Sequence, residues 1–147
     1  MNFQDYLQKS IKIANEEKEI LDELSKRRTL NKIEIRAAKS SLQTLIENSI
    51  GKAKKILKHY NAPITPTRSK DAIIFMYEIG LISEDKFRVL NSAIGFRNSM
   101  IHDYMEFDEN ILKEILYEQK YLDIYDFLIQ IPEYNDTLRK RIENFSL

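Results

Sequence analysis

The sequence contains no cysteine. This absence excludes disulfide bonds, thiolate ligands for zinc or iron–sulfur clusters, and cysteine nucleophiles, and it is compatible with a reducing cytosol. Glycine and proline occur only three times each, too rarely for the turns of a many-stranded sheet. Residues that favour helices, mainly Leu, Ile, Lys, Glu and Ala, dominate instead. The composition therefore predicts an all-α fold.

Long apolar runs are also missing. No stretch approaches the roughly 18 uninterrupted apolar residues that are needed to cross a bilayer. The opening residues MNFQDYLQKS lack the apolar centre of a secretory signal. We therefore expect a soluble, cytoplasmic protein without a membrane partner. With 147 residues, 43% of them hydrophobic, the chain can bury one helical core, and we expect a single domain over residues 1–147.

Neither sign of charge is in excess, because 23 Lys and Arg balance 23 Asp and Glu. The protein thus lacks the overall positive field that drives non-specific nucleic-acid binding, and an RNA-binding role requires a local basic patch. Three groups of cations are candidates, although each is also typical of a solvated helix face or loop. They are Lys26-Arg27-Arg28, the run Lys52, Lys54, Lys55 and Lys58, and the pair Arg68 and Lys70.

Metal ligands are scarce as well. With two histidines and no cysteine, a zinc site is not expected. His59 has no second potential ligand at a useful spacing and is interpreted as a surface histidine. The acidic residues, such as Glu16 and Glu17, are typical of solvated helix faces, and nothing supports a two-carboxylate glycosidase site. We expect no metal and no other cofactor.

Apolar residues recur every three to four positions, which is the spacing of amphipathic helices. A loop with two prolines, residues 61–67, interrupts this pattern. The expected helices cover residues 3–24, 31–60, 69–79, 83–101 and 108–131, with a short sixth helix after Pro132. The expected N-terminal caps are Asn31, Ser69, Ser83 and Asp108, and Gly80 is the expected left-handed C-terminal cap.

One stretch, GFRNSMIHDY over residues 95–104, gathers reactive polar groups on an otherwise apolar helix. Arg97 and His102 are five residues apart, about 140° around a helix and roughly 7.5 Å along it, close enough for the guanidinium to reach back toward the imidazole. Both can then contact one phosphate. Arginine can hold the phosphoryl oxygens as charge accumulates, and a histidine can transfer a proton near neutrality. The same spacing also occurs by chance in helical proteins. In that alternative the arginine forms an interhelical salt bridge and the histidine lies on the surface.

The order of residues in this stretch matches a known motif. Gly95 and Phe96 precede Arg97, and Asn98 follows it. Four residues separate Arg97 from His102, and one residue separates His102 from Tyr104. In this order the chain resembles HEPN-superfamily ribonuclease toxins of the HepT type, which belong to HEPN/MNT toxin–antitoxin systems. The resemblance covers residues from about 36 to 131. It includes the long helix AAKSSLQTLIENSIGKAKKIL, the segment EIGLIS and the segment EFDENILKEIL, whereas the N-terminal helix and the tail after Pro132 add nothing specific.

The resemblance implies an antiparallel bundle of about five to six helices that forms a two-fold homodimer, with two motif copies across a shared cleft. It also implies a metal-independent endoribonuclease in which the ribose 2′-hydroxyl attacks the adjacent phosphorus. His102 would move the proton and Arg97 would hold the phosphoryl oxygens. Asn98 would contact the RNA backbone or hold Arg97, and DNA would not be a substrate because it lacks the 2′-hydroxyl.

In the family, the tyrosine of the motif is adenylated by the partner antitoxin, a minimal MNT-type nucleotidyltransferase. The resemblance therefore implies that Tyr104 lies beside the RNA and is modified by such a partner; the simpler interpretation is a tyrosine packed beside the helix end. Adenylation would place a negative phosphodiester next to Arg97 and compete with RNA for that cation. The chain itself lacks the Gly-Ser turn and paired aspartates of a transferase.

Two other interpretations remain open. Related helical proteins with a similar Arg-to-His spacing pair with a nucleotidyltransferase as its non-catalytic, substrate-binding subunit. A plain dimerising scaffold, in which neither side chain carries out chemistry, is the third possibility.

Overall fold

The computed structural model describes residues 2–102 and 107–145. The described residues form α-helices and no β-strands, which confirms the all-α prediction. The seven helices of the described residues are α1 (Phe3–Ser25), α2 (Lys32–His59), α3 (Ser69–Glu78), α4 (Glu84–His102), α5 (Glu109–Tyr117), α6 (Tyr121–Ile129) and α7 (Asp136–Glu143). None of the helices in the described residues is long and apolar enough to span a membrane.

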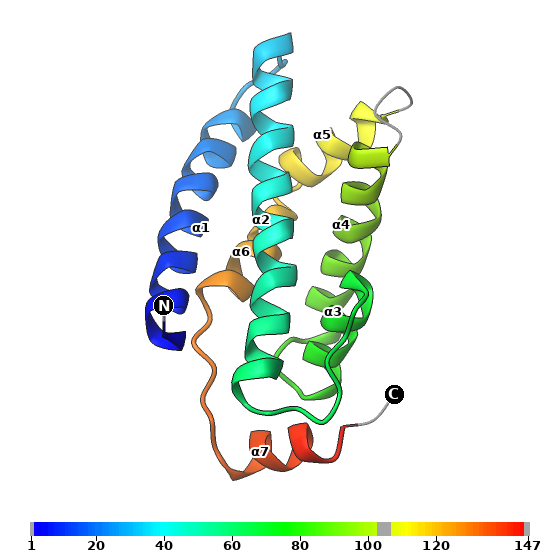
Figure 1. Ribbon diagram of the computed structural model, residues 1–147. Helices are drawn as coiled ribbons and strands as arrows, with labels where there is room; N and C mark the ends of the chain where they lie inside the picture. The colour runs from blue at the N-terminus through cyan, green and yellow to red at the C-terminus, as the bar shows by residue number, and fades with distance from the viewer. Residues whose placement is uncertain (1, 103–106, 146–147) are drawn as a thin grey trace.

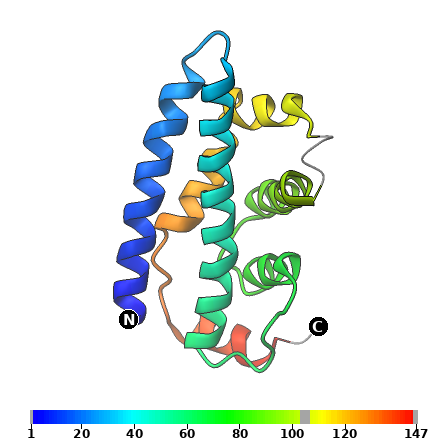
Figure 2. The ribbon, with the colours of Figure 1, turned by 45° about the horizontal axis from the view of Figure 1, so that its top comes forward.

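Helix α2 is the centre of the bundle. It contacts α1, α3, α4, α5 and α6. Helices α1 and α2 run side by side in opposite directions, whereas α3 and α4 lie on the other side of α2 (Figures 1 and 2). Helix α7 lies across the end of the bundle where α2 finishes (Figure 1). The face of α2 that points into the bundle is buried over Ala38, Leu42, Leu45, Ile46, Ser49, Ala53, Ile56 and Leu57.

Most of the expected helix ends are confirmed by side-chain contacts. Asn31 and Glu34 form a capping box at the start of α2, each side chain accepting a hydrogen bond from the other residue's backbone N–H. The hydroxyl of Ser83 accepts a hydrogen bond of 3.2 Å from the N–H of Lys86. Gly80 has the left-handed φ of 79° that was expected after α3. These local signals place the beginning of α4, which carries the motif.

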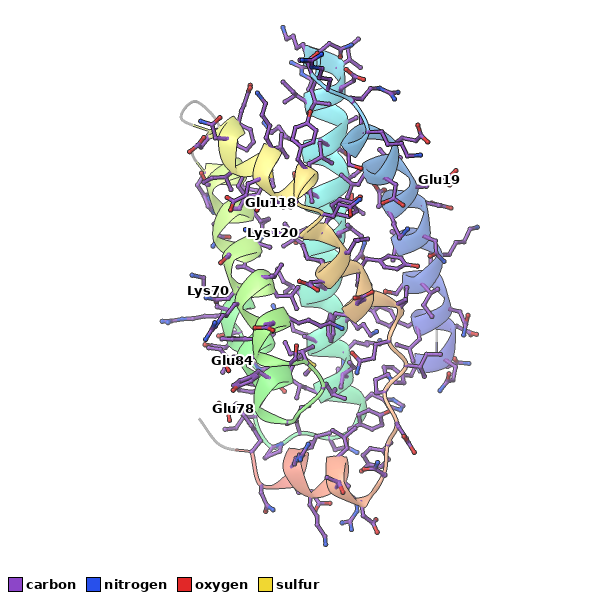
Figure 3. All side chains as sticks on the ribbon, turned by 180° about the vertical axis from the view of Figure 1, so that it is seen from behind. Glu19, Lys70, Glu78, Glu84, Glu118 and Lys120 are labelled. Atoms are coloured by element: carbon purple, nitrogen blue, oxygen red, sulfur yellow. The ribbon has the colours of Figure 1, made fainter. Side chains whose placement is uncertain are left out.

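The expected helix over residues 108–131 is in fact two helices. Asp108 caps α5 as predicted, but the chain turns at Glu118–Lys120, where Gln119 has a φ of 55°. Figure 3 labels Glu118 and Lys120 at this junction, and the Lys120 ammonium lies 2.7 Å from Oε1 of Glu114. The turn lets α6 pack against α1, α2 and α4 at once, which a straight continuation of α5 would not do. Periodicity did not reveal this break because apolar residues continue through it.

The predicted basic run on α2 was wrong for one of its members, Lys52. It was expected on a solvated face with Lys54, Lys55 and Lys58, but its side chain is fully buried at 0% exposure. Its ammonium donates hydrogen bonds to the carbonyl oxygens of Phe127 (2.6 Å), Leu128 (3.1 Å) and Gln130. These carbonyls close α6, where the last turn of a helix lacks backbone partners. Burial lowers the pKa of Lys52 to about 8. Lys52 therefore joins α2 to α6 and is not available to a ligand.

Candidate active site

Helix α4 holds the motif in place through its apolar face. Phe96 and Met100 are buried on either side of Arg97, one turn apart, and Leu90, Ala93 and Ile94 anchor the helix further back. Arg97 and Asn98 are half-buried, while His102 is exposed at the last residue of the helix. The motif thus runs from the interior of the bundle to its surface.

The guanidinium of Arg97 sits where three helices meet. Its Nη2 donates a hydrogen bond of 2.9 Å to the hydroxyl of Ser69 on α3. Its Nε lies 3.2 Å from Oε1 of Glu47 on α2, with the Arg97 side chain 14% exposed and that of Glu47 46% exposed. This ion pair lacks hydrogen-bond geometry, so the buried Nε–H has no hydrogen-bond partner among the described residues. Because this Nε atom is buried, the unpartnered donor is not open to an outside anion in the described arrangement.

Ser69 does not act as the predicted N-terminal cap of α3. Arg68 occupies the capping position without a side-chain hydrogen bond, and Ser69 is the first residue of the helix. Its hydroxyl instead accepts the hydrogen bond from Arg97. Sequence reasoning missed this partner and also Glu47, because both lie far from Arg97 in the chain. No local pattern distinguishes Glu47 from the other charged residues of α2.

His102 and Arg97 are not in direct contact. His102 is exposed, and no hydrogen bond or ion pair joins it to Arg97 in the part of the chain that the structure describes. The guanidinium is turned toward α2 and α3 instead of reaching back along α4. The imidazole is accessible to a substrate, and the meeting of the two groups on one phosphate stays a prediction.

The other residues of the predicted motif, and the second histidine, lie apart from the guanidinium of Arg97 or outside the described residues. Asn98 is half-buried and, within the described residues, its side chain makes no hydrogen bond, so the predicted contact with Arg97 is not observed. Tyr104 lies outside the described residues. The second histidine, His59, is exposed as expected and stacks on Phe3 with ring centroids 3.9 Å apart. No three His, Asp or Glu side chains within residues 2–102 and 107–145 lie close enough together to hold a metal ion.

A polar hollow adjoins the partner of Arg97 on α2. It is open to solvent and is lined by Ser40, Gln43, Thr44, Glu47 and Asn48. Its side chains offer hydroxyl, amide and carboxylate groups, all of which form hydrogen bonds with polar ligands. Glu47 therefore lies between the buried guanidinium and an accessible polar surface.

Two solved structures share this fold. One is a crystal structure of a toxin–antitoxin with AMP-PNP, with a TM-score of 0.73, 18% identity, and coverage of 94% of this chain and 99% of that chain. The other is the tri-AMPylated HEPN toxin of Shewanella oneidensis in complex with an MNT antitoxin, with a TM-score of 0.74, 20% identity, and coverage of 87% and 96%. At these identities the likeness shows a common fold. No curated protein matches the chain.

The family comparison covers most of the chain. The model of the family described as "Ribonuclease HepT-like" matches residues 7–131. The match includes α4 with its motif and also most of α1, which had added nothing specific to the resemblance. The chain therefore belongs to the HepT-like family.

Proposed function

We propose that this chain is a toxin that cleaves RNA as a metal-independent endoribonuclease in the cytoplasm. The observation that carries the proposal is the placement of Arg97, whose guanidinium Glu47 and Ser69 hold in one orientation where α2, α3 and α4 meet. His102 lies five residues further on, at the exposed end of the same helix. Membership of the HepT-like family supports RNA as the substrate.

In the proposed reaction the ribose 2′-oxygen attacks the adjacent phosphorus. His102 takes the proton from the 2′-hydroxyl and returns it to the 5′-oxygen, which leaves as the bond between phosphorus and that oxygen breaks. Arg97 holds the non-bridging oxygens as negative charge increases on them. Asn98 and Tyr104 contact the RNA beside the reacting phosphate. The products are a cyclic phosphate and a 5′-hydroxyl end.

The proposal also includes two protein partners. A second copy of the chain forms a two-fold homodimer in which two motif copies share one cleft. An MNT-type nucleotidyltransferase antitoxin attaches adenylate to Tyr104 and thereby blocks Arg97. Support for the antitoxin comes from the two structures of similar fold, one a toxin–antitoxin with AMP-PNP and the other an AMPylated toxin in complex with an MNT antitoxin.

The test compares cleavage of total RNA in the presence of a chelator. The wild-type protein is expected to cleave, and Arg97→Ala and His102→Ala are each expected to lower the rate at least about 100-fold, as is typical for loss of an acid–base or charge-stabilising group. Arg88→Ala is the matched control, because Arg88 is an exposed arginine on the same helix whose salt bridge with Glu84 stays on the surface. The cyclic phosphate is detected by end analysis of the products. RNA that stays intact with the wild-type protein contradicts the proposal.

A non-catalytic role is the second candidate. It is favoured by the observation that the Arg97 guanidinium engages Glu47 and Ser69, as a structural arginine would, without contacting His102. In that case the chain is the substrate-binding subunit of a nucleotidyltransferase. Purified chain and transferase are then expected to form a complex whose nucleotide transfer to a small substrate depends on the chain, with RNA intact throughout. Adenylate found on Tyr104, and absent from Tyr104→Phe, favours the toxin instead.

A further inference from the structure

A groove with three cations lies between the beginning of α2 and the beginning of α5. Its lining residues, which we call the basic groove, are Lys32, Ile35, Arg36, Lys39, Phe107 and Glu109. Lys32 and Arg36 are exposed, and Lys39 is half-buried. The three cations follow one another at intervals of four and three residues, which places them on one face of α2. Because two or three other residues separate each cation from the next, the three do not stand out as a basic cluster in the sequence.

The basic groove has a local excess of positive charge although the whole chain is neutral. Among the lining residues that the structure describes, Glu109 is the single carboxylate. None of the three cations makes a salt bridge within the described residues, whereas Arg27, just before α2, is paired with Glu34 at 2.8 Å. Cations that lack carboxylate partners are available to neutralise an anion.

The basic groove also connects with the motif helix through aromatic side chains. The ammonium of Lys39 lies 4.2 Å from the centroid of the Phe107 ring, a cation–π contact that holds it over the groove. The Phe107 ring is 5.4 Å from the ring of Phe96, the residue before Arg97. Helix α2 continues from Lys39 to Glu47, the partner of Arg97, over about 12 Å at 1.5 Å per residue.

We propose that the basic groove binds the sugar–phosphate backbone of single-stranded RNA next to the linkage that is cleaved. Lys32, Arg36 and Lys39 each contact a phosphate, and the RNA then continues along α2 toward Arg97. This inference rests on the proposed function, and it adds a binding path outside the motif. A row of cations that tracks the backbone, with an aromatic side chain beside it, is typical of surfaces that bind single strands. Contacts of this kind fix the position of the RNA without reading its sequence.

Binding is measured separately from cleavage. The probe is a fluorescently labelled single-stranded RNA oligonucleotide, titrated with the His102→Ala protein and followed by anisotropy at several salt concentrations. The test variant adds K32Q/R36Q/K39Q, since glutamine keeps helix propensity and length while removing charge. The matched control adds K54Q/K55Q/K58Q, three charges at least about 22 Å further along α2. Thermal unfolding shows that each variant is folded.

The triple groove variant is expected to raise Kd about tenfold or more at low salt. The slope of log K against log salt is expected to decrease by about 2, because each phosphate contact on a single strand contributes about 0.7. Glu109→Gln is expected to tighten binding, since it removes the carboxylate from the groove. The control at Lys54, Lys55 and Lys58 is expected to change neither quantity by as much.

The inference is overturned if the folded groove variant binds RNA with the Kd and salt slope of its parent, or if the control loses as much affinity. The alternative occupant of the groove is an acidic protein. The inference is also overturned if the groove variant binds RNA like its parent but has lost binding to such a protein. Failure of the proposed function gives a different result. In that case RNA is not cleaved by the protein that retains His102, whatever the groove variant does to binding.

Discussion

Ser69 accepts a hydrogen bond of 2.9 Å from Nη2 of Arg97 and so fixes the guanidinium of α4 to the first residue of α3. Glu47 on α2 contacts the same guanidinium through Nε at 3.2 Å. Because the three helices pack around one side chain, the direction of Arg97 is set by tertiary contacts on two sides. An arginine that is oriented before RNA binds has less side-chain freedom to lose when it meets a phosphate.

Ser69→Ala removes the hydroxyl and leaves the rest of the site unchanged. We expect the rate of RNA cleavage to decrease about tenfold, because a hydrogen bond to a charged group contributes about 1.5–3 kcal/mol. Ser69→Thr keeps a hydroxyl and is expected to restore most of the rate. The measurement is kcat with a defined RNA oligonucleotide, and Ser92→Ala, on the exposed part of α4, is the control. Equal rates for Ser69→Ala and the wild type would show that the hydrogen bond does not position Arg97.

Glu47→Gln removes a negative charge that lies 3.2 Å from the guanidinium. We expect RNA to bind several-fold more tightly, since the carboxylate repels the phosphate and partly neutralises Arg97. The measurement is Kd for an RNA oligonucleotide in the His102→Ala background, with Glu16→Gln on the exposed face of α1 as control. Weaker binding by Glu47→Gln would mean that the carboxylate serves mainly to orient Arg97.

Lys52→Met tests the cap on α6. The substitution keeps an apolar side chain of similar length but leaves the carbonyls of Phe127, Leu128 and Gln130 without their donor. We expect the free energy of unfolding in urea to decrease by about 2 kcal/mol or more, because a buried polar group without a partner costs about 1–3 kcal/mol. Lys58→Met, at an exposed position, is expected to stay within about 0.5 kcal/mol of the wild type. A similar loss in both variants would contradict the capping role.

The pH dependence of unfolding provides a further test of Lys52. Burial lowers its pKa in the folded chain from 10.5 to about 8, so between these values the unfolded chain holds a proton that the folded chain has released. We therefore consider the difference in free energy of unfolding, wild type minus Lys52→Met. Between pH 8 and 10.5 this difference is expected to rise by up to about 1.4 kcal/mol per pH unit. Below about pH 8 the difference is expected to be constant. A difference that falls between pH 8 and 10.5 would mean that the pKa is raised.

Two glycines should respond in opposite directions to alanine. Gly80 has a φ of 79°, a left-handed conformation that residues with a Cβ atom disfavour, so Gly80→Ala is expected to destabilise the fold by about 1–2 kcal/mol. The added Cβ atom would also displace the flexible end of Arg141. Gly95 lies inside α4, and a Cβ atom there meets nothing within 4 Å. Gly95→Ala is thus expected to stabilise the fold by about 0.5–1 kcal/mol. Thermal unfolding of both variants checks the contrast, and a loss of stability in both would contradict it.

Several features of this protein followed from short stretches of sequence. The low glycine and proline content predicted the all-α fold. Asn31, Ser83 and Asp108 cap the beginnings of their helices as expected, and Gly80 follows the end of α3. Capping and helix periodicity involve residues at most a few positions apart, which is why a single sequence is sufficient to recognise them. The same holds for the motif, whose order and spacing lie within one helix and the residues that follow it.

Other features depend on which helices pack together. Lys52 has the appearance of a surface lysine until α6 places three carbonyl oxygens over it. Ser69 has the appearance of a helix cap until α4 brings Arg97 to its hydroxyl, and Glu47 resembles any other charge on α2. The environment of such a side chain is created by segments far away in the chain. Local sequence therefore determined most of the helices and the order of the motif, whereas the break between α5 and α6 escaped it and only the packing of α2, α3 and α4 decided what the guanidinium contacts.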